Sequence, residues 1–525
     1  MPVDYLKIGK ASDLTGRDYR LYRLWEIFPG SLSWLTLLGL AILSFFQPVW
    51  VAVFVILFDI FWLLQVVYLA IYLVSAYRQM RRVMKTDWQA KCQTLGSRDF
   101  AIKTATGPVQ KTLAWPDLYH LVIFPFSSEG LEVIRTTFHG LVKDNYPKDK
   151  MIIVLGAEGR MGDEALAKAE AIKQEFGHLF RNFLITVHPA DLVGEMKGKG
   201  ANQAWAAKEA KREIIDREEL DYDKILVSVF DVDTEIARGY FHCLTYRFFT
   251  AEAPYRSSYQ PIPVYNNNIW QAPFFSRIAA FSNTFWQMML QLRQEKLATY
   301  SSHSMPWRVL VDIDFWSTNM VSEDSRIFFH SWFFYDGDYR VEPLYFIISM
   351  DACMDKSFLY TAKNLYKQQR RWGWGVENVP YLIFNTIKQW RRLPKQKALY
   401  QIFIQIYGFH SWATNALIIA GVGWLPLLIG GNRFNESVLS NNLPAITQAL
   451  MNLAMVGMLL SAIIATLILP PKPPHYGFVR RIVMVIQWLF LPISIVIFGA
   501  IPGLEAQTRL MFAKYMGFWV TPKKR

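Results

Sequence analysis

The first cluster of residues that could do chemistry is Asp231-Val232-Asp233, which directly follows an apolar run. In an extended chain, side chains two residues apart point the same way, so both carboxylates could approach one hard cation such as Mg²⁺ or Mn²⁺. The pair therefore predicts a metal site, and its alternative is a solvated strand end.

A second acidic cluster, Glu323-Asp324, follows Ser322. A carboxylate near the metal could act as a general base if the hydrogen-bonding geometry allows it. The alternative is structural, because Ser322 followed by two acids is a good helix N-cap. The two roles are compatible.

The third cluster is Gln368-Gln369-Arg370-Arg371-Trp372, with a further tryptophan at Trp374. Guanidinium groups bind diphosphate oxygens in a bidentate manner, and indole faces stack on sugar rings. The alternative is a basic and aromatic belt at a membrane boundary.

The composition is that of a membrane protein. Of 525 residues, 52% are hydrophobic and only 19% are charged, yet the formal net charge is +13. An ordinary soluble enzyme is less apolar, and the excess of positive charge suits anionic headgroups or a phosphorylated substrate. The three cysteines form neither a disulfide framework nor a metal-ligand pattern.

Long apolar runs on both sides of the central region predict membrane spans. We expect a cytoplasmic segment over 1–30, two transmembrane helices within 31–75 and, because of the basic cluster that follows them, a cytoplasmic domain next. Asp59 lies inside the second run; a functional carboxylate and one that pairs with a neighbouring helix are both open.

The C-terminal part predicts an interfacial amphipathic helix over 376–398 and about three spans within 399–525. Five spans would put Lys523-Lys524-Arg525 outside, against the positive-inside rule. Either Leu504 to Val520 re-enters the membrane, or one span lies at the interface.

The region 86–375 alternates short apolar runs with helical patterns, which predicts an α/β domain with a mostly parallel sheet. Ligands bind such sheets beyond the carboxyl ends of the strands. Within this region, the aromatic-rich stretch from Pro254 to Trp307 suits either carbohydrate stacking or an interfacial helix. The expected strands are 120–124, 151–155, 183–187 and 225–230, and the expected helices are 132–143 and 163–176.

The order and spacing of the three clusters resemble those of the membrane-embedded family 2 glycosyltransferases, the cellulose-, hyaluronan- and chitin-synthase-like enzymes with D-x-D, ED and QxxRW motifs. The resemblance covers roughly residues 118–375 and the flanking transmembrane layout. It implies a GT-A-like domain that binds a nucleotide sugar, is inserted between N- and C-terminal transmembrane helices, and transfers the sugar with inversion. The donor would be a nucleotide sugar, with a UDP-sugar expected, and the cofactor Mg²⁺ or Mn²⁺.

By this resemblance, Asp231 and Asp233 would hold the metal on the donor diphosphate, and Asp324, beside Glu323, would be the general base. Donor and acceptor would contact the third cluster at Gln368, Gln369, Arg371 and Trp372.

The resemblance also points to residues nearer the nucleotide. Glu129 matches an acid in the loop after the first strand, and either Lys197 or Lys199 matches a basic position before the D-x-D strand. Glu158 stands where the family usually has an aspartate that contacts the base. This difference leaves the identity of the nucleotide open.

Three functions follow. The chain could extend a glycan at the cytoplasmic face and translocate it, transfer one or a few sugars to a lipid-linked acceptor, or be a non-catalytic membrane transporter or scaffold. The presence of all the acidic motifs argues against the third. The expected partners are a nucleotide-sugar donor, a glycan or lipid-linked acceptor and the bilayer. An accessory export partner is compatible with the sequence, and no nucleic acid is expected. The expected location is the plasma (inner) membrane, with several spans.

Overall fold

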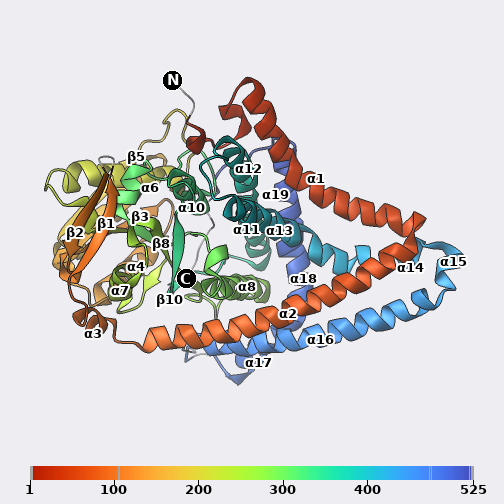
Figure 1. Cartoon of the computed structure of the whole chain (residues 1–525). Helices are drawn as coiled ribbons and strands as arrows, with labels where there is room; N and C mark the ends of the chain where they lie inside the picture. Colours follow the sequence, from red (N-terminus) through yellow and green to blue (C-terminus); the bar gives the residue numbers. More distant parts are fainter. Residues whose placement is uncertain (1–3, 105–106, 472, 475, 520, 522–525) are drawn as a thin grey trace.

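The chain forms a sheet domain from which long helices extend (Figure 1). The computed structural model describes residues 4–104, 107–471, 473–474, 476–519 and 521. The predicted α/β domain between N- and C-terminal apolar helices is confirmed.

An eight-stranded sheet with the order β5-β4-β3-β6-β9-β8-β10-β7 is the centre of the domain. Neighbours within β5-β4-β3-β6 are parallel, as are β8 and β10, whereas β9 and β7 run against their neighbours. The sheet is therefore mostly parallel. The strands are β3 (Tyr119–Phe126), β4 (Met151–Glu158), β5 (Asn182–His188), β6 (Ile225–Val229), β7 (Glu235–Ile236), β8 (Ser257–Tyr265), β9 (His303–Pro306) and β10 (Arg340–Met350).

Helices cover both faces of the sheet because its strands are apolar on both sides. On β3, Val122 and Phe124 join one buried cluster, and Leu121 and Ile123 join the other. The first cluster is completed by α4 (Leu131–Lys143), α5 (Asp163–Phe176) and α7 (Tyr240–Thr250). The second is completed by α6 (Lys199–Ala210), α9 (Trp307–Asp312) and α10 (Glu323–Phe334). Outside the main sheet, α3 (Trp88–Gln93) precedes the hairpin of β1 (Arg98–Thr104) and β2 (Gly107–Leu113).

The aromatic-rich stretch from Pro254 to Trp307 is largely part of this core. It supplies β8, α8 (Phe274–Gln291) and β9. Strand β8 contains Pro261 and Pro263, which lack an N–H on the same side of the strand because they are two residues apart. The pairing of β8 with β9 is correspondingly sparse, whereas its parallel pairing with β10 runs almost along its length.

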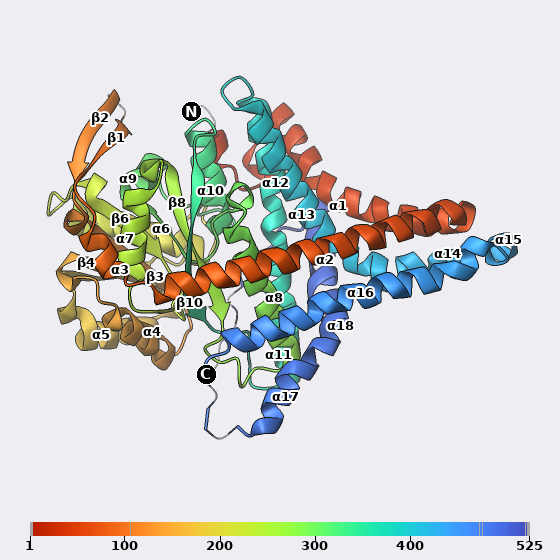
Figure 2. The same ribbon diagram turned by 60° about the horizontal axis from the view of Figure 1, so that its bottom comes forward.

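Four helices are long and apolar enough to cross a membrane within the part of the chain that is described. They are Gly16–Phe46 (α1), Pro48–Lys85 (α2), Val438–Ile468 (α16) and the run Ile482–Met511. The pair Lys395–Ala420 (α13) and Val422–Ile429, bent by 43°, is a fifth candidate. Helices α1, α2 and α16 extend away from the sheet domain, and the short helices α14 (Leu425–Ile429) and α15 (Gly431–Asn435) lie at their far end (Figure 2).

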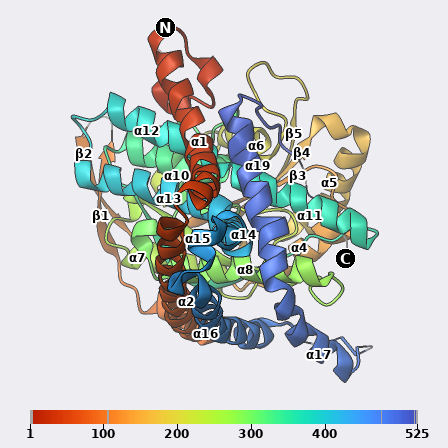
Figure 3. The same ribbon diagram turned by 90° about the vertical axis from the view of Figure 1, so that its right-hand side faces the viewer.

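The run Ile482–Met511 behaves differently, because it contacts the sheet domain or its helices along much of its length. It comprises parts of α17 (Phe478–Ile486), then α18 (Leu491–Ile495) and α19 (Ile501–Met511). Gln487 accepts a hydrogen bond from Arg277 of α8 (2.5 Å), Phe498 stacks on Phe275, and Gly503 lies against Gly373 of α11 (Phe358–Gly373). Beyond α19 the described chain continues into the domain (Figure 3).

The segment 376–398, expected to lie at the membrane interface, contains α12 (Asn378–Lys388). Residues 378–386 of this helix are all buried. The fully buried Arg326 of α10 donates to Asn378 (2.7 Å) and to the carbonyl of Ile8 (2.7 Å). The N-terminal segment, α10 and α12 are thereby joined into one packed unit.

Candidate active site

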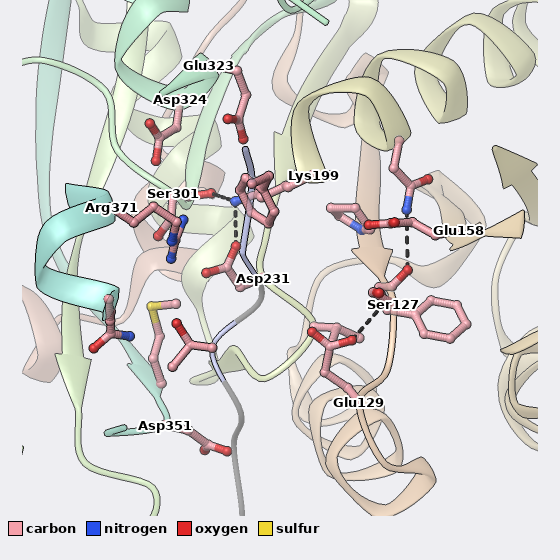
Figure 4. A pocket seen from close by; sticks show the side chains of 18 of the residues that line it. Ser127, Glu129, Glu158, Lys199, Asp231, Ser301, Glu323, Asp324, Asp351 and Arg371 are labelled. Carbon is pink, nitrogen blue, oxygen red and sulfur yellow. Dashed lines mark hydrogen bonds and ion pairs between the residues drawn. The ribbon is translucent and has the colours of Figure 1, made fainter. Parts of the chain in front are cut away.

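A pocket that opens to solvent lies at the carboxyl ends of β3, β4, β6, β8 and β10, with about 840 Å³ of empty space when the open solvent at its mouth is included. In Figure 4, Lys199, Asp231, Glu323, Asp324 and Arg371 gather on one side of the pocket, and Glu129 and Glu158 lie on the other. Its walls are formed by Pro125, Phe126, Ser127, Glu129, Glu158, Lys199, Asn202, Asp231, Val232, Tyr265, Ser301, Glu323, Asp324, Met350, Asp351, Gln368, Arg371, Trp372, Phe518 and Thr521. All three sequence clusters are represented in this wall.

The α-helical geometry of α11 decides which residues of the third cluster face the pocket. Gln368, Arg371 and Trp372 are three and four positions apart, so they share one face of the helix and all line the pocket. Gln369 is buried outside the pocket wall. Arg370 points to α19, where its guanidinium donates to Glu505 (2.6 Å).

The two candidate lysines have different surroundings. Lys199, in the first turn of α6, forms an ion pair with Asp231 and donates to the Ser301 carbonyl (2.6 Å). Lys197 is an exposed residue outside the pocket wall that pairs with Asp191 (2.8 Å). In Figure 4 the Lys199 ammonium lies between Asp231 and the acidic pair of α10.

The D-x-D segment is a turn and not an extended strand. The Thr234 amide donates to the Asp231 carbonyl (2.9 Å), so the expected alternation of side chains does not apply. Asp231 lines the pocket, whereas Asp233 is fully buried and accepts a hydrogen bond from the Asp351 amide (2.9 Å). The extended geometry expected for this pair is therefore wrong, whereas the assignment of Asp233 as a metal ligand is not tested by it and stays a prediction.

The carboxylates that line the pocket still fit a hard cation in their chemistry. Asp231 and Asp351 both border it, and Mg²⁺ commonly uses one or two carboxylates together with substrate phosphates. No group of three or more His, Cys, Asp or Glu side chains suited to a metal occurs among the described residues. A hard cation bound here could complete its coordination with water and with substrate phosphates.

Glu323 and Asp324 form the first turn of α10. Burial raises the pKa of Asp324, and the nearby charges of Lys199 and Arg371 lower it in part. For Glu323, burial and then the negative charge of Asp324 raise the pKa. The helix N-terminus and the two cations thus oppose the effect of burial on the pKa values of this pair.

The sequence predicted that the Ser322 side chain caps α10, but this side chain makes no capping hydrogen bond. Its hydroxyl donates instead to the buried carboxylate of Glu377, which also accepts the Ser322 amide (2.9 Å) and the Trp374 indole N–H (2.9 Å). Glu377 therefore ties the start of α10 to the end of α11. No motif in the sequence marked this residue.

The wall at the ends of β3 and β4 carries two further acids. Glu129 accepts the Ser127 amide (2.7 Å), and Glu158 forms an ion pair with Arg160. Asn202 of α6 holds the two strand ends together, because its amide donates to the carbonyls of Gly156 (2.8 Å) and Phe126 (3.3 Å). A Cβ at position 156 would lie 2.7 Å from the Asn202 side chain, so only glycine leaves room for this contact.

Several wall residues were not anticipated. Asp351 follows β10, so the rule that ligands bind after strand ends would have found it had that strand been recognised. Phe518 and Thr521 come from the chain beyond α19. The Phe518 ring lies 5.0 Å from the Arg371 guanidinium, and no sequence pattern indicated that the end of the chain reaches this pocket.

The comparisons with known proteins give distant similarities to solved structures. One is the mannosyltransferase PcManGT from Pyrobaculum calidifontis in complex with GDP-Man and Mn²⁺, with 15% identity, 77% of this chain and 98% of that chain covered, and a TM-score of 0.41. Another is S. aureus TarS 1–349 in complex with UDP-GlcNAc, with 11% identity, 66% and 90% covered, and a TM-score of 0.35. No family model and no curated protein matches the chain.

Proposed function

We propose that this protein is a membrane-embedded, inverting glycosyltransferase that moves a sugar from a nucleotide sugar to a growing glycan at the cytoplasmic membrane face. One observation carries the proposal. Asp231, Asp324 and Arg371, from three motifs spread over about 140 residues of sequence, line a single pocket. A packed structural core gives no reason for these charged groups to converge on open space.

Each residue has a role that its position supports. Asp324 accepts the proton of the attacking acceptor hydroxyl, and its raised pKa makes it a stronger base than an ordinary aspartate. Arg371 binds the diphosphate, on which negative charge grows as the sugar leaves. Trp372, which lies 6.0 Å from Tyr265 between ring centroids, offers an aromatic face that orients the acceptor sugar. Attack opposite the leaving group inverts the anomeric centre.

A divalent cation fits beside these groups. Asp231, with Asp351 near it in the pocket wall, would hold Mg²⁺ or Mn²⁺, which when bound would offset the charge of the diphosphate. Before the donor arrives, Lys199 neutralises Asp231. The ammonium of Lys199, which lines the same pocket, is placed to bind the phosphates of the donor.

For the membrane arrangement we propose four crossings: α1, α2, the bent pair of α13 and α14, and α16. The run Ile482–Met511 contacts α8 at one end, and its other end leads back to the pocket. We therefore place it along the interface beside the domain, which is one of the two solutions open from the sequence. An even number of crossings leaves both ends of the described chain on the side of the catalytic domain. The basic C-terminal residues 523–525 lie outside the described residues.

The test uses purified protein in lipid vesicles with Mg²⁺ or Mn²⁺ and a panel of radiolabelled nucleotide sugars, beginning with UDP-sugars. An Asp324→Asn variant serves as the control. A long polymer from one donor, absent with the variant, is the expected result. A short, lipid-extractable product would mean that the acceptor is a lipid-linked sugar and not a growing glycan. No turnover that depends on Asp324 with any donor would contradict the proposed function.

A further inference from the structure

A second cavity lies within the helix bundle, away from the sheet domain. Its walls come from α2, from the last turn of α13 and the short 3-10 turn Val422–Trp424 that follows it, and from α16, and it admits a single water-sized particle. Its lining residues are Val55, Asp59, Ile418, Ile419, Gly423, Trp424, Leu443 and Thr447. Among otherwise apolar walls, one carboxylate and one hydroxyl face a space of the size of a small ion.

Asp59 is deeply buried in this bundle, with only 2% of its surface exposed. It lies eleven residues after the start of α2, or about 17 Å along the helix at 1.5 Å per residue. That depth is near the middle of a hydrocarbon core of about 30 Å. A carboxylate at this depth is costly unless a positive charge accompanies it.

The cavity lining brings no positive side chain to Asp59. None of the residues that line the cavity is a lysine, arginine or histidine. Within the described residues, neither the Asp59 Oδ2 atom nor the Thr447 hydroxyl makes a well-aligned hydrogen bond, and the two side chains lie beside each other. Both oxygens are therefore available to a ligand in the cavity.

The third side of the cavity is the broken helix. Helix α13 ends at Ala420, and Gly421 departs from helical geometry with φ −140° and ψ −62°. The last four carbonyls of a helix lack intrahelical partners and carry the negative end of its dipole. Ile418 and Ile419 belong to this last turn, and the Ile418 carbonyl lies 3.0 Å from where a Cβ on Gly423 would be. Glycine keeps the approach to this carbonyl open.

We propose that Asp59, Thr447 and the carbonyl end of α13 bind one monovalent cation of the size of Na⁺ inside the membrane. The donors are all oxygens, as a hard cation requires, and the single carboxylate balances a single positive charge. Discontinuous helices whose freed carbonyls face a cavity are a common way to hold Na⁺ within a bilayer. The proposal is independent of the transfer reaction, because the cavity shares no residue with the active-site pocket.

The experiment measures binding of radioactive sodium to the full-length protein in lipid nanodiscs, with choline as the balancing cation. About one saturable site per chain is expected from the single carboxylate and the one-particle cavity. Asp59→Asn should abolish this site. Glu436→Gln removes an exposed carboxylate near the far end of the bundle and should leave it unchanged.

A second variant keeps the test decisive if Asp59→Asn folds poorly. Thr447→Val retains the shape of the side chain and should weaken sodium binding about tenfold through the loss of one oxygen ligand. Thermal unfolding of the wild-type protein should also occur at a higher temperature in sodium than in choline. No saturable sodium binding, or equal binding in wild type and Asp59→Asn, would overturn the proposal and favour a protonated, purely structural Asp59.

Discussion

The ammonium group of Lys199 is ion-paired with the carboxylate of Asp231 at the edge of the sheet where the donor is proposed to bind. Its positive charge also lowers the pKa of Asp324 against the effect of burial. One lysine thus interacts with Asp231, the proposed metal ligand, and with Asp324, the proposed general base. This coupling separates it from Lys197, two positions earlier, which pairs only with an exposed acid.

Replacing Lys199 by methionine should move the acidic limb of the pH–activity profile to higher pH. A general base must be deprotonated, and loss of the lysine raises the pKa of Asp324, so the base is protonated over a wider acidic range. Turnover at neutral pH should also fall about ten- to hundredfold through loss of a charged contact. Initial rates between pH 5 and 9 check this. The Lys197→Met variant is the matched control, and an equal shift in that variant would argue against the assignment.

Glu377→Gln should separate kcat from KM. Its carboxylate accepts from Ser322 and Trp374 and so fixes the start of α10 relative to α11. An amide would present donors to donors, and a small displacement of Asp324 should reduce kcat about ten- to hundredfold. The donor KM should change little because Arg371 stays in place.

Steady-state kinetics with varied donor concentration measure both constants. Glu505→Gln, which changes a carboxylate bonded to the opposite face of α11, is the comparison. A rise in KM with kcat preserved would contradict the positioning role of Glu377.

The adjacent residues Arg370 and Arg371 provide a direct test of which helix face binds the diphosphate. Arg371→Lys keeps the charge but loses the planar fork, and kcat/KM should fall about a hundredfold. Arg370→Lys can keep its ion pair with Glu505 and should remain close to wild type. Similar losses in the two variants would mean that the assignment of faces is wrong.

Phe518→Ala should increase hydrolysis of the donor relative to transfer. The Phe518 ring covers the Arg371 side of the pocket. Its loss would admit water, which competes with the acceptor for the sugar. Scoring free sugar against glycan product measures the ratio, and a several-fold rise is expected. Trp519→Ala is the control, because that ring lies over Lys367 and outside the pocket wall. An unchanged ratio in Phe518→Ala would count against this role.

The parallel half of the sheet could be predicted because its strands are short apolar runs separated by helical patterns. The helix expected at 163–176 coincides with α5, and strands at the expected positions carry Glu129, Glu158 and Asp231 at or just beyond their ends. Motif order brought Asp324 and Arg371 into the same expected site. Local patterns are sufficient where the polypeptide alternates regularly between strand and helix.

Other features depend on contacts between distant parts of the chain. Strand β8 was not predicted because its two prolines are unusual in an inner strand. The spacing of two aspartates likewise does not distinguish the turn after β6 from an extended strand end. Glu377 and Phe518 acquire their significance only when α10, α11 and the end of the chain meet. No local sequence pattern indicates these contacts between distant segments.

The most direct test of the account measures release of nucleoside diphosphate by the protein in vesicles, with the preferred donor and a saturating acceptor. The wild-type protein should turn over, and Asp324→Asn should lose about three orders of magnitude in kcat while still binding donor, because an amide cannot accept the proton. If Asp324→Asn turned over within about tenfold of the wild type, Asp324 would not be the base, and the proposed reaction at this pocket would be contradicted.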